Sequence, residues 1–292
     1  MSWASKLSDP YRIDHGKKFR LKDFDPADIG QFHSKEHAQE LLDKGICDMQ
    51  VLQDKLYAQD RWGVLIILQA LDAAGKDGLI KHVMSGVNPQ GCQVYSFKQP
   101  SSEELNHDYM WRAHVRMPER GHIGIFNRSY YEEALVVRVH SDILKAERIP
   151  EELVGKNIWQ ERFEDYVNFE RYLARNGVVV RKFFLNLSKK EQKKRFMERL
   201  DNPEKNWKFS AADVREREYW DDYMKAFEDV IAATSKKHAP WYVVPADNKW
   251  YTRLVVAAAI VDTLESLNLS YPKVRAAERK ELLEARTQLE GE

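Results

Sequence analysis

Residues 64–68 read Val-Leu-Ile-Ile-Leu, and this uninterrupted aliphatic run restricts the possible fold more than any other feature of the chain. A strand with apolar side chains on both faces is buried on both faces, which is typical of parallel sheets covered by helices. Further apolar runs follow at residues 94–97, 123–126, 178–187 and 241–244. Helical patterns separate the runs, so the sequence predicts an α/β fold, with a five-stranded parallel sheet between two helical layers.

The chain divides into three segments. Residues 1–60 are predicted to form an N-terminal arm, irregular up to residue 34, and then a packing helix that Ser34 caps. Residues 61–272 hold all five runs and are predicted to form the core, with a helical lid at about residues 188–215. Residues 273–292 form a charged, helix-prone tail. Helices of the core are expected at residues 102–117, 151–175, 188–200, 211–236 and 250–267.

Composition limits the classes of partner and compartment. Lys and Arg number 46, as do Asp and Glu, so any affinity for a polyanion must come from local clusters of basic residues. Two cysteines, Cys47 and Cys92, are too few for a disulfide framework, which favours a reducing compartment. Neither a signal peptide nor a membrane-spanning run is apparent, so we expect a cytoplasmic protein.

The loop after the first strand has the character of a phosphate site. It reads Asp72-Ala73-Ala74-Gly75-Lys76-Asp77 and leads directly into a helical segment. Backbone N–H groups at a helix N-terminus can cradle phosphate oxygens, and Lys76 adds a positive charge. The alternative is an ordinary βα turn in which Gly75 and Lys76 occur by chance.

The loop departs from the strict P-loop pattern G-x-x-x-x-G-K-[ST] at two positions. Ala70 stands in place of the first glycine, and Asp77 stands in place of the hydroxyl that binds a metal ion. A metal ion would therefore be bound differently here. The carboxylate of Asp72 is the obvious replacement ligand for Mg²⁺.

The third apolar run is followed by a second group of candidate residues. Asn127 stands where many P-loop enzymes carry a metal-ordering aspartate, and Arg128 is expected to point into the same cleft. Tyr131 and Glu132 follow at the start of the next helix. The alternative is a surface turn with an ordinary charged cluster.

Two further segments carry clustered arginines. Residues 101–116 are predicted to form a helix with a capping box, which would place Arg112 and Arg116 on one face. Basic residues outnumber acidic ones in residues 188–208, where Arg195 and Arg199 lie one helical turn apart. A helix after the fourth strand is where nucleotide kinases carry a mobile lid, although either pair of arginines could simply face solvent.

Four separated motifs, in this order, resemble a known family. They read LDAAGKDG, GIFNRSYYEE, LSKKEQKKRF with the following DNPEKNWKFS, and APWYVVPADNKW. The chain resembles the family-2 polyphosphate kinases from about residue 20 to residue 267. That resemblance implies a P-loop kinase core that transfers phosphate between inorganic polyphosphate and nucleotides, in a chain that self-associates as a homodimer or homotetramer.

The resemblance also implies roles for individual residues. Asp72 would bind Mg²⁺, with Mn²⁺ as an alternative, Lys76 would bind phosphate, and Arg128 would match the family arginine beside the third strand. Either Arg195 or Arg199 would be the lid arginine, and we favour Arg199. The nucleotide contacts would be Ala73, Ala74, Gly75, Asp77, Asn127, Tyr131 and Glu132. The basic groove for polyphosphate would draw on Lys81, Arg112, Arg116, Arg120 and Lys208.

Two departures from the family pattern point to a subgroup. Asn127 replaces an aspartate and Glu132 replaces an asparagine found in other members, as in members that phosphorylate AMP as well as ADP. The expected substrates are polyphosphate and adenine nucleotides, with guanine nucleotides as a further option, and neither nucleic acid nor membrane is expected as a partner. The rival functions are an ATP-dependent nucleotide kinase and a non-catalytic binding module.

Overall fold

A six-stranded sheet forms the centre of the computed structural model, which describes residues 2–32 and 34–292. The strand order is β1-β6-β5-β2-β4-β3, and all neighbours are parallel except β1 and β6. The long aliphatic run lies in β2, at the middle of the sheet. The strands are β1 (Arg12–Ile13), β2 (Gly63–Gln69), β3 (Cys92–Ser96), β4 (Ile123–Asn127), β5 (Val178–Asn186) and β6 (Trp241–Pro245).

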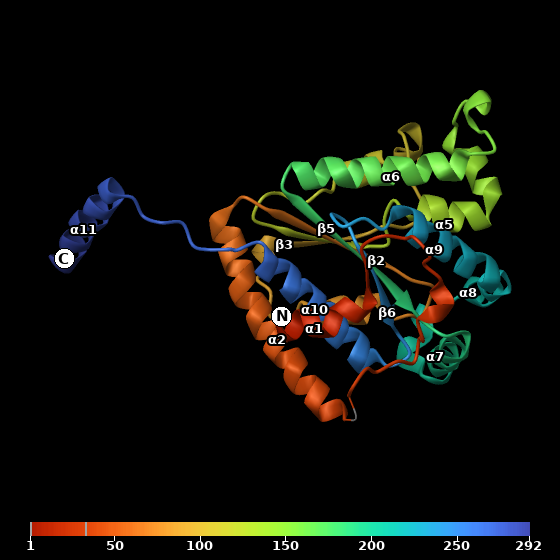
Figure 1. Ribbon diagram of the computed structural model, residues 1–292, viewed down its shortest axis with the longest axis horizontal. Coiled ribbons are helices and arrows are strands. Elements are labelled where there is room, and N and C mark those ends of the chain that lie inside the picture. Colours follow the sequence, from red (N-terminus) through yellow and green to blue (C-terminus); the bar gives the residue numbers. More distant parts are fainter. Residues whose placement is uncertain (1, 33) are drawn as a thin grey trace.

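Helices cover both faces of this sheet (Figure 1). The α-helices are α1 (Trp3–Ser8), α2 (Lys35–Gln59), α3 (Lys76–Val83), α4 (Trp111–His114), α5 (Glu132–Val139), α6 (Ile158–Arg175), α7 (Lys189–Asp201), α8 (Ala211–Arg215), α9 (Trp220–Thr234), α10 (Lys249–Ser266) and α11 (Ala276–Glu290). The 3₁₀ turns are η1 (Asp9–Tyr11), η2 (Leu21–Asp23), η3 (Pro89–Gly91), η4 (Glu104–Asn106), η5 (Ser141–Glu147), η6 (Glu151–Leu153), η7 (Pro203–Lys208) and η8 (Glu216–Tyr219).

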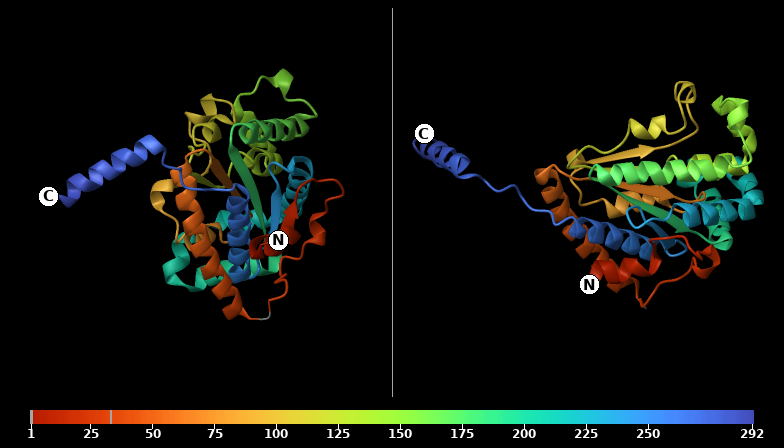
Figure 2. Two further views of the ribbon diagram at one scale, coloured as in Figure 1. Left: turned by 60° about the vertical axis from the view of Figure 1, so that its left-hand side comes forward. Right: turned by 45° about the horizontal axis from the view of Figure 1, so that its top comes forward.

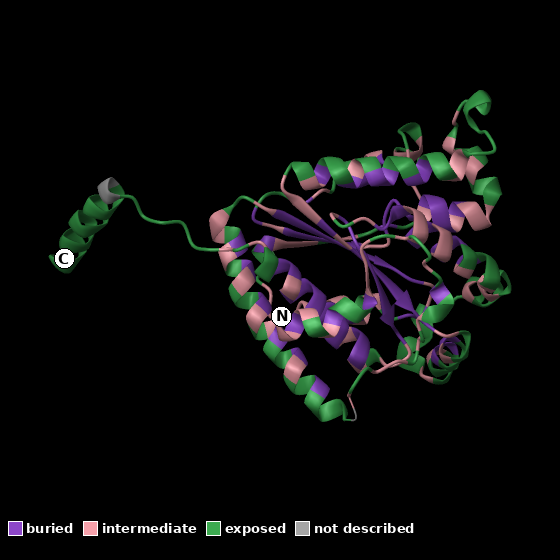
Figure 3. Cartoon of the chain, in the orientation of Figure 1, coloured by how far each residue is buried: buried purple, intermediate pink, exposed green. Residues whose placement is uncertain are grey.

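Strand β2 explains why two helical layers form. Val64, Ile66 and Leu68 face the core that contains α1, α2, α3 and α10, whereas Leu65 and Ile67 face the core that contains α5, α6 and α9. Successive side chains of a strand point to opposite faces, so an unbroken apolar run buries both. Figure 3 shows the buried residues concentrated in the sheet and on the helix surfaces that meet it. The predicted α/β architecture with two helical layers is confirmed.

The sheet has one strand more than the five predicted. The extra strand, β1, has only two residues and pairs antiparallel with β6 at the sheet edge. Residues 2–13 are therefore ordered, contrary to the expectation of an irregular arm: α1 packs on α10, and the hydroxyl groups of Tyr11 and Tyr251 lie 2.8 Å apart. A strand this short carries no detectable alternation of apolar and polar residues.

The prediction of one continuous helix at residues 102–117 is wrong. Its capping box does form, because Ser101 N–H donates to Glu104 Oε2 (2.8 Å) and Glu104 N–H donates to Ser101 Oγ (3.2 Å). The box closes only the single turn η4, however, and His107 then adopts an extended conformation. Asp108 Oδ1 next accepts from Met110 N–H (2.9 Å), which starts the separate short helix α4. Local side-chain bonds thus compete with the continuous helix.

The C-terminal tail extends away from the body. Residues 267–275 connect α10 to α11, which lies well apart from the remainder of the chain (Figure 2). Leu282, Leu283 and Leu289 of this helix are exposed. Among the described residues, no helix is both long enough and apolar enough to cross a membrane.

Candidate active site

An open cavity of about 1280 Å³ lies beyond the carboxyl ends of β2, β4 and β3. Ligands of open parallel sheets bind at this edge, because the loops that follow the strands converge there. The walls come from the loop after β2, the segments after β3 and β4, helix α5 with η5, and the end of η7. The lining includes Asp72, Lys76, Asp77, Lys98, Arg112, Asn127, Arg128, Glu132, Arg199, Trp207 and Lys208.

Residues 70–75 form the turn from β2 into α3. Ala73 and Gly75 both have positive φ values, 62° and 99°, and Gly75 is the N-cap residue of α3. Only glycine adopts the second value without strain. The first N–H groups of a helix have no partner within the helix, so those of α3 are available to an anion in the cavity. Ala73, Ala74, Gly75 and Asp77 all line it.

Lys76 is folded back onto this loop. Its Nζ donates to the carbonyl oxygen of Ala70 (2.9 Å) and lies 3.5 Å from that of Leu71. Burial, together with the nearby cation of Arg128, lowers the pKa of Lys76 to about 8. A phosphate oxygen would be a stronger partner than these neutral carbonyl groups, because a hydrogen bond between two ions is about twice as strong.

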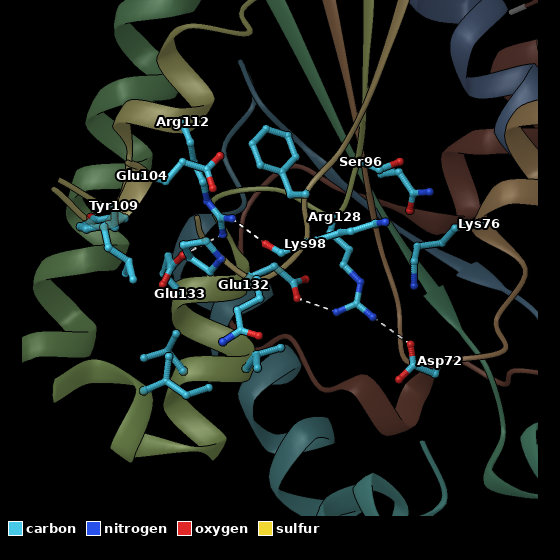
Figure 4. A pocket seen from close by; sticks show the side chains of 18 of the residues that line it. Asp72, Lys76, Ser96, Lys98, Glu104, Tyr109, Arg112, Arg128, Glu132 and Glu133 are labelled. Atoms are coloured by element: carbon cyan, nitrogen blue, oxygen red, sulfur yellow. Dashed lines mark hydrogen bonds and ion pairs between the residues drawn. The ribbon is translucent and has the colours of Figure 1, made fainter. Parts of the chain in front are cut away.

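Arg128 links the two groups of candidate residues (Figure 4). Its Nη2 donates to Asp72 Oδ1 (2.8 Å) and its Nη1 donates to Glu132 Oε2 (2.9 Å). The Glu132 and Asp72 carboxylates raise the pKa of Arg128 above its usual value. The structure thus brings together on one wall of the cavity Asp72 from the loop after β2, Lys76 from α3, Arg128 from the turn after β4 and Glu132 from α5.

The donor set fits a divalent cation that arrives with its substrate. The carboxylate of Asp72 is about one-third exposed and lines the cavity. Asp77 also lines the cavity and accepts from Asn127 Nδ2 (2.8 Å). Mg²⁺ usually binds through one or two carboxylates and completes its shell with water and substrate phosphates. In keeping with this, no three His, Cys, Asp or Glu side chains of the described residues gather into a ready-made metal site.

The two arginines of α7 have different environments. Arg199 lines the cavity, donates to Lys208 O (3.2 Å) and lies 3.6 Å from Asp213 Oδ2. Arg195 is only 4% exposed, and its guanidinium donates to four carbonyl oxygens. These belong to Ala73 (3.1 Å), Ala74 (2.9 Å), Ala246 (2.6 Å) and Asp247 (3.0 Å). Arg195 therefore stabilises the loop between β2 and α3, whereas Arg199 is the arginine that a ligand in the cavity can contact.

The residues proposed for the basic groove do not all reach the cavity. Arg112 and Lys208 line it, but Arg112 is already paired with Glu133 (3.0 Å). Lys81 is exposed on α3, outside the lining. Arg116 does not share a helical face with Arg112, because α4 ends at His114, and it stacks on Tyr95 instead. Arg120 donates to Arg61 O at the opposite, amino-terminal edge of the sheet.

Tyr131 also lies apart from the cavity. It is fully buried, and its hydroxyl group bonds to Glu170 rather than facing a ligand. By contrast, Lys98 is exposed and lines the cavity, although the sequence analysis did not select it. Lys98 directly follows the apolar run at residues 94–97, and a basic residue just after a strand is the signal that would have identified it.

Comparison with known proteins identifies the family. A family model described as polyphosphate kinase 2 matches residues 32–272. The chain belongs to this family. An ADP-polyphosphate phosphotransferase of Rhodopseudomonas palustris is 54% identical over 282 residues, covering 94% of this chain and 98% of the relative. An AMP/ADP-polyphosphate phosphotransferase of Meiothermus ruber is 45% identical over 275 residues, covering 94% and 99%.

A solved structure of the polyphosphate kinase 2 family has the same fold. The crystal structure of polyphosphate kinase 2 from Arthrobacter aurescens TC1 matches this chain with a TM-score of 0.87 and 38% identity. The match covers 97% of this chain and 99% of that one. The six-stranded, mostly parallel sheet and its helical layers are therefore those of the family.

Proposed function

We propose that the cavity transfers the terminal phosphoryl group of inorganic polyphosphate to AMP and to ADP. The observation that carries this proposal is the row formed by Lys76, Asp72, Arg128 and Glu132 along one wall, beside the exposed start of α3. Pockets for single small ligands usually measure about 300–1000 Å³. A cavity of about 1280 Å³ has room for an acceptor nucleotide together with a segment of phosphate chain.

The reaction needs positioning and charge neutralisation rather than a strong base. The attacking group is a phosphate oxygen of the acceptor, which is already ionised near pH 7. Lys76 and the N–H groups of α3 would hold the donor phosphates, and Arg128 would neutralise charge on the transferred group. Asp72 and Asp77 would hold Mg²⁺ or Mn²⁺, which when bound supplies further neutralisation of phosphate charge.

The segment from α7 to α8 would act as the lid of a P-loop kinase fold. Arg199, Trp207 and Lys208 approach the cavity from this segment. Closure would move the Arg199 guanidinium from Asp213 to the transferred phosphoryl group. Exchange of a surface carboxylate for a multiply charged phosphate favours the closed state when donor is present.

Glu132 is the proposed determinant of the acceptor. Its Oε2 accepts from Arg128, and in the orientation of the Gln69 amide that satisfies both of its ends, Oε1 accepts from Gln69 (2.7 Å). Both carboxylate oxygens thus have fixed partners beside the phosphate site. We propose that this placement lets the cavity accept AMP as well as ADP.

Three further properties accompany this function. Adenine nucleotides are the proposed acceptors, with guanine nucleotides as a further option. The protein is proposed to act in the cytoplasm, where these nucleotides are made and used. A homodimer or homotetramer is the proposed assembly.

A donor-swap assay tests the function. AMP and ADP are incubated separately with polyphosphate and Mg²⁺, and the nucleotides formed are separated and quantified. The proposal expects ADP from AMP and ATP from ADP. A matched reaction with ATP as the only donor separates the rival: turnover with ATP and none with polyphosphate would indicate an ATP-dependent kinase. Binding of nucleotide without turnover from either donor would indicate a binding module.

A further inference from the structure

A fully buried ion pair lies below the cavity and takes no part in the proposed chemistry. Lys182 of β5 and Glu170 of α6 are each 0% exposed, and Lys182 Nζ donates to Glu170 Oε2 (2.6 Å). Desolvation of two charges often exceeds the attraction between them, so a buried pair is weak support for a role in stability. Its presence in the core of α6, α9 and the sheet calls for another explanation.

The pair forms the centre of a closed hydrogen-bond network. Glu170 Oε1 accepts from the hydroxyl groups of Tyr130 (2.9 Å) and Tyr131 (2.8 Å). Lys182 also donates to Tyr131 Oη (3.1 Å) and to Thr234 O (2.9 Å), which uses all three of its protons. Burial raises the pKa of both tyrosines well above the usual value, so their hydroxyl groups remain protonated donors.

The two tyrosines lie two and three residues after Arg128. Arg128 has φ = 64°, in the left-handed region that a residue with a Cβ atom rarely adopts. Such a conformation persists only where the surrounding structure imposes it, and it clusters at functional sites. The turn is held from the other side as well, because Arg128 N–H donates to Leu68 O (3.0 Å) and, in the orientation of the Gln69 amide given above, the Gln69 side-chain oxygen accepts from Ser129 N–H (3.1 Å) and Ser129 Oγ (2.9 Å).

We infer that Glu170 and Lys182 are positioning residues, which hold Arg128 in its left-handed conformation by anchoring Tyr130 and Tyr131. The network fixes the chain immediately after the turn, and the continuation of the β4 ladder fixes it immediately before. The guanidinium is thereby directed at Asp72 and Glu132 before any substrate binds. This inference rests on the proposed role of Arg128 in neutralising the transferred phosphoryl group.

Removal of the two hydroxyl groups tests the inference with little change in packing. The variant Tyr130→Phe/Tyr131→Phe detaches the turn while Glu170 and Lys182 remain paired. We expect kcat to fall about 10- to 100-fold, because small displacements of a group that acts in the transition state have effects of this size. KM for AMP should change much less, since binding of the nucleotide does not depend on this turn alone.

A matched control separates positioning from loss of stability. Ser235→Ala removes the bond from Ser235 Oγ to Ile231 O (2.7 Å), which lies in the same core but outside the network. We expect a lower Tm and an unchanged kcat. If the double phenylalanine variant does not fold, Tyr130→Phe alone removes one anchor, and kcat should still fall while the control retains its value.

A double-mutant cycle with Arg128→Ala decides whether the effect passes through Arg128. In that background the two phenylalanines should cause no further loss, because the group they position is gone. An equal loss in both backgrounds, or a kcat of the phenylalanine variant equal to wild type, would overturn the inference. The proposed function has its own outcome in the same assays, since wild-type protein that fails to use polyphosphate would refute that function and, with it, the role of Arg128 on which the inference rests.

Discussion

Lys76 shows how one side chain can be both predicted and placed. The pattern of strand, small-residue loop and helix located it in the sequence, and the structure sets its ammonium group against backbone carbonyl oxygens at the start of α3. The sequence could not predict that Arg128 lies close to Lys76, because this proximity depends on the pairing of β2 with β4. Burial of the ammonium group, together with the Arg128 cation that this pairing of strands brings close, lowers the pKa of Lys76 to about 8.

Replacement of Lys76 should abolish transfer and spare the fold. Lys76→Ala removes a charge that faces the donor phosphates, and loss of one such group typically costs about 10²–10³ in kcat. Lys81→Ala is the matched control, because Lys81 is an exposed lysine of the same helix outside the cavity. Near-normal turnover of Lys76→Ala, with melting curves equal to wild type, would contradict this role.

Binding of a phosphate chain should depend on pH through Lys76. A bound anion favours the ammonium form, so it raises the pKa of Lys76 above the value of about 8 in the free protein. Affinity for tripolyphosphate should therefore fall as the pH rises above 8, by up to about tenfold per pH unit. Calorimetric titration of wild type and Lys76→Ala separates this effect from ionisation of the ligand, and parallel curves for the two proteins would refute it.

Glu132 should influence the choice of acceptor. Glu132→Asn removes the carboxylate that pairs with Arg128 and leaves an amide on a side chain that is one methylene shorter. We expect the kcat/KM for AMP to fall more than that for ADP, by about tenfold, since the lost charge pairing is worth one to two hydrogen bonds. Equal losses for the two acceptors, measured under the same donor concentration, would show that Glu132 is not the discriminator.

Among the helices, α7 shows that a sequence pattern can predict the helix without predicting which of its side chains face a ligand. Helical spacing placed Arg195 and Arg199 one turn apart but could not distinguish their roles. The tertiary structure does so, because α7 packs Arg195 against four carbonyl oxygens and leaves Arg199 at the cavity. Strand β1 and the break in the helix predicted at residues 102–117 could not be predicted for related reasons: β1 is defined only by its partner β6, and the Asp108 side chain bonds to Met110 N–H just before α4.

Replacement of Arg199 should therefore affect the reaction rate, whereas replacement of Arg195 should affect the stability of the fold. Arg199→Ala should reduce kcat by about 10³-fold at unchanged Tm, which is the lower range for an arginine that stabilises a transferred phosphoryl group. Arg195→Ala should lower the free energy of unfolding by about 2–4 kcal/mol, because it leaves buried carbonyl oxygens without donors. Thermal melts and single-turnover assays of both variants would test this, and the reverse assignment would contradict it.

In the whole molecule, a chain with zero formal net charge has its proposed phosphate site in a cavity at the carboxyl ends of the parallel strands. The buried runs and the loop motif predicted that edge, because parallel strands bring their carboxyl ends together. They could not predict that Arg120 lies at the other edge or that Tyr131 belongs to the core. The position of Arg120 depends on the path of its loop, and that of Tyr131 depends on the buried Glu170. No local sequence pattern predicts either of them.

The C-terminal tail should be dispensable for catalysis. Helix α11 lies apart from the body, and the family model ends at residue 272. Deletion of residues 273–292 should leave kcat and KM for polyphosphate within about twofold of wild type, since none of the tail side chains that the structure describes lines the cavity. A larger loss of activity would assign the tail a part in the site, and light scattering on the same samples would show whether it affects assembly.

The proposed function depends on binding of the donor phosphate at the loop between β2 and α3. A crystal structure of the full chain with AMP, tripolyphosphate and Mg²⁺ tests it most directly. We expect a phosphate against the N–H groups at the start of α3, with Lys76 released from the Ala70 carbonyl and the metal ion bound to Asp72. Density for donor, acceptor and metal at another site, with no ligand at the loop between β2 and α3, would contradict the proposed function.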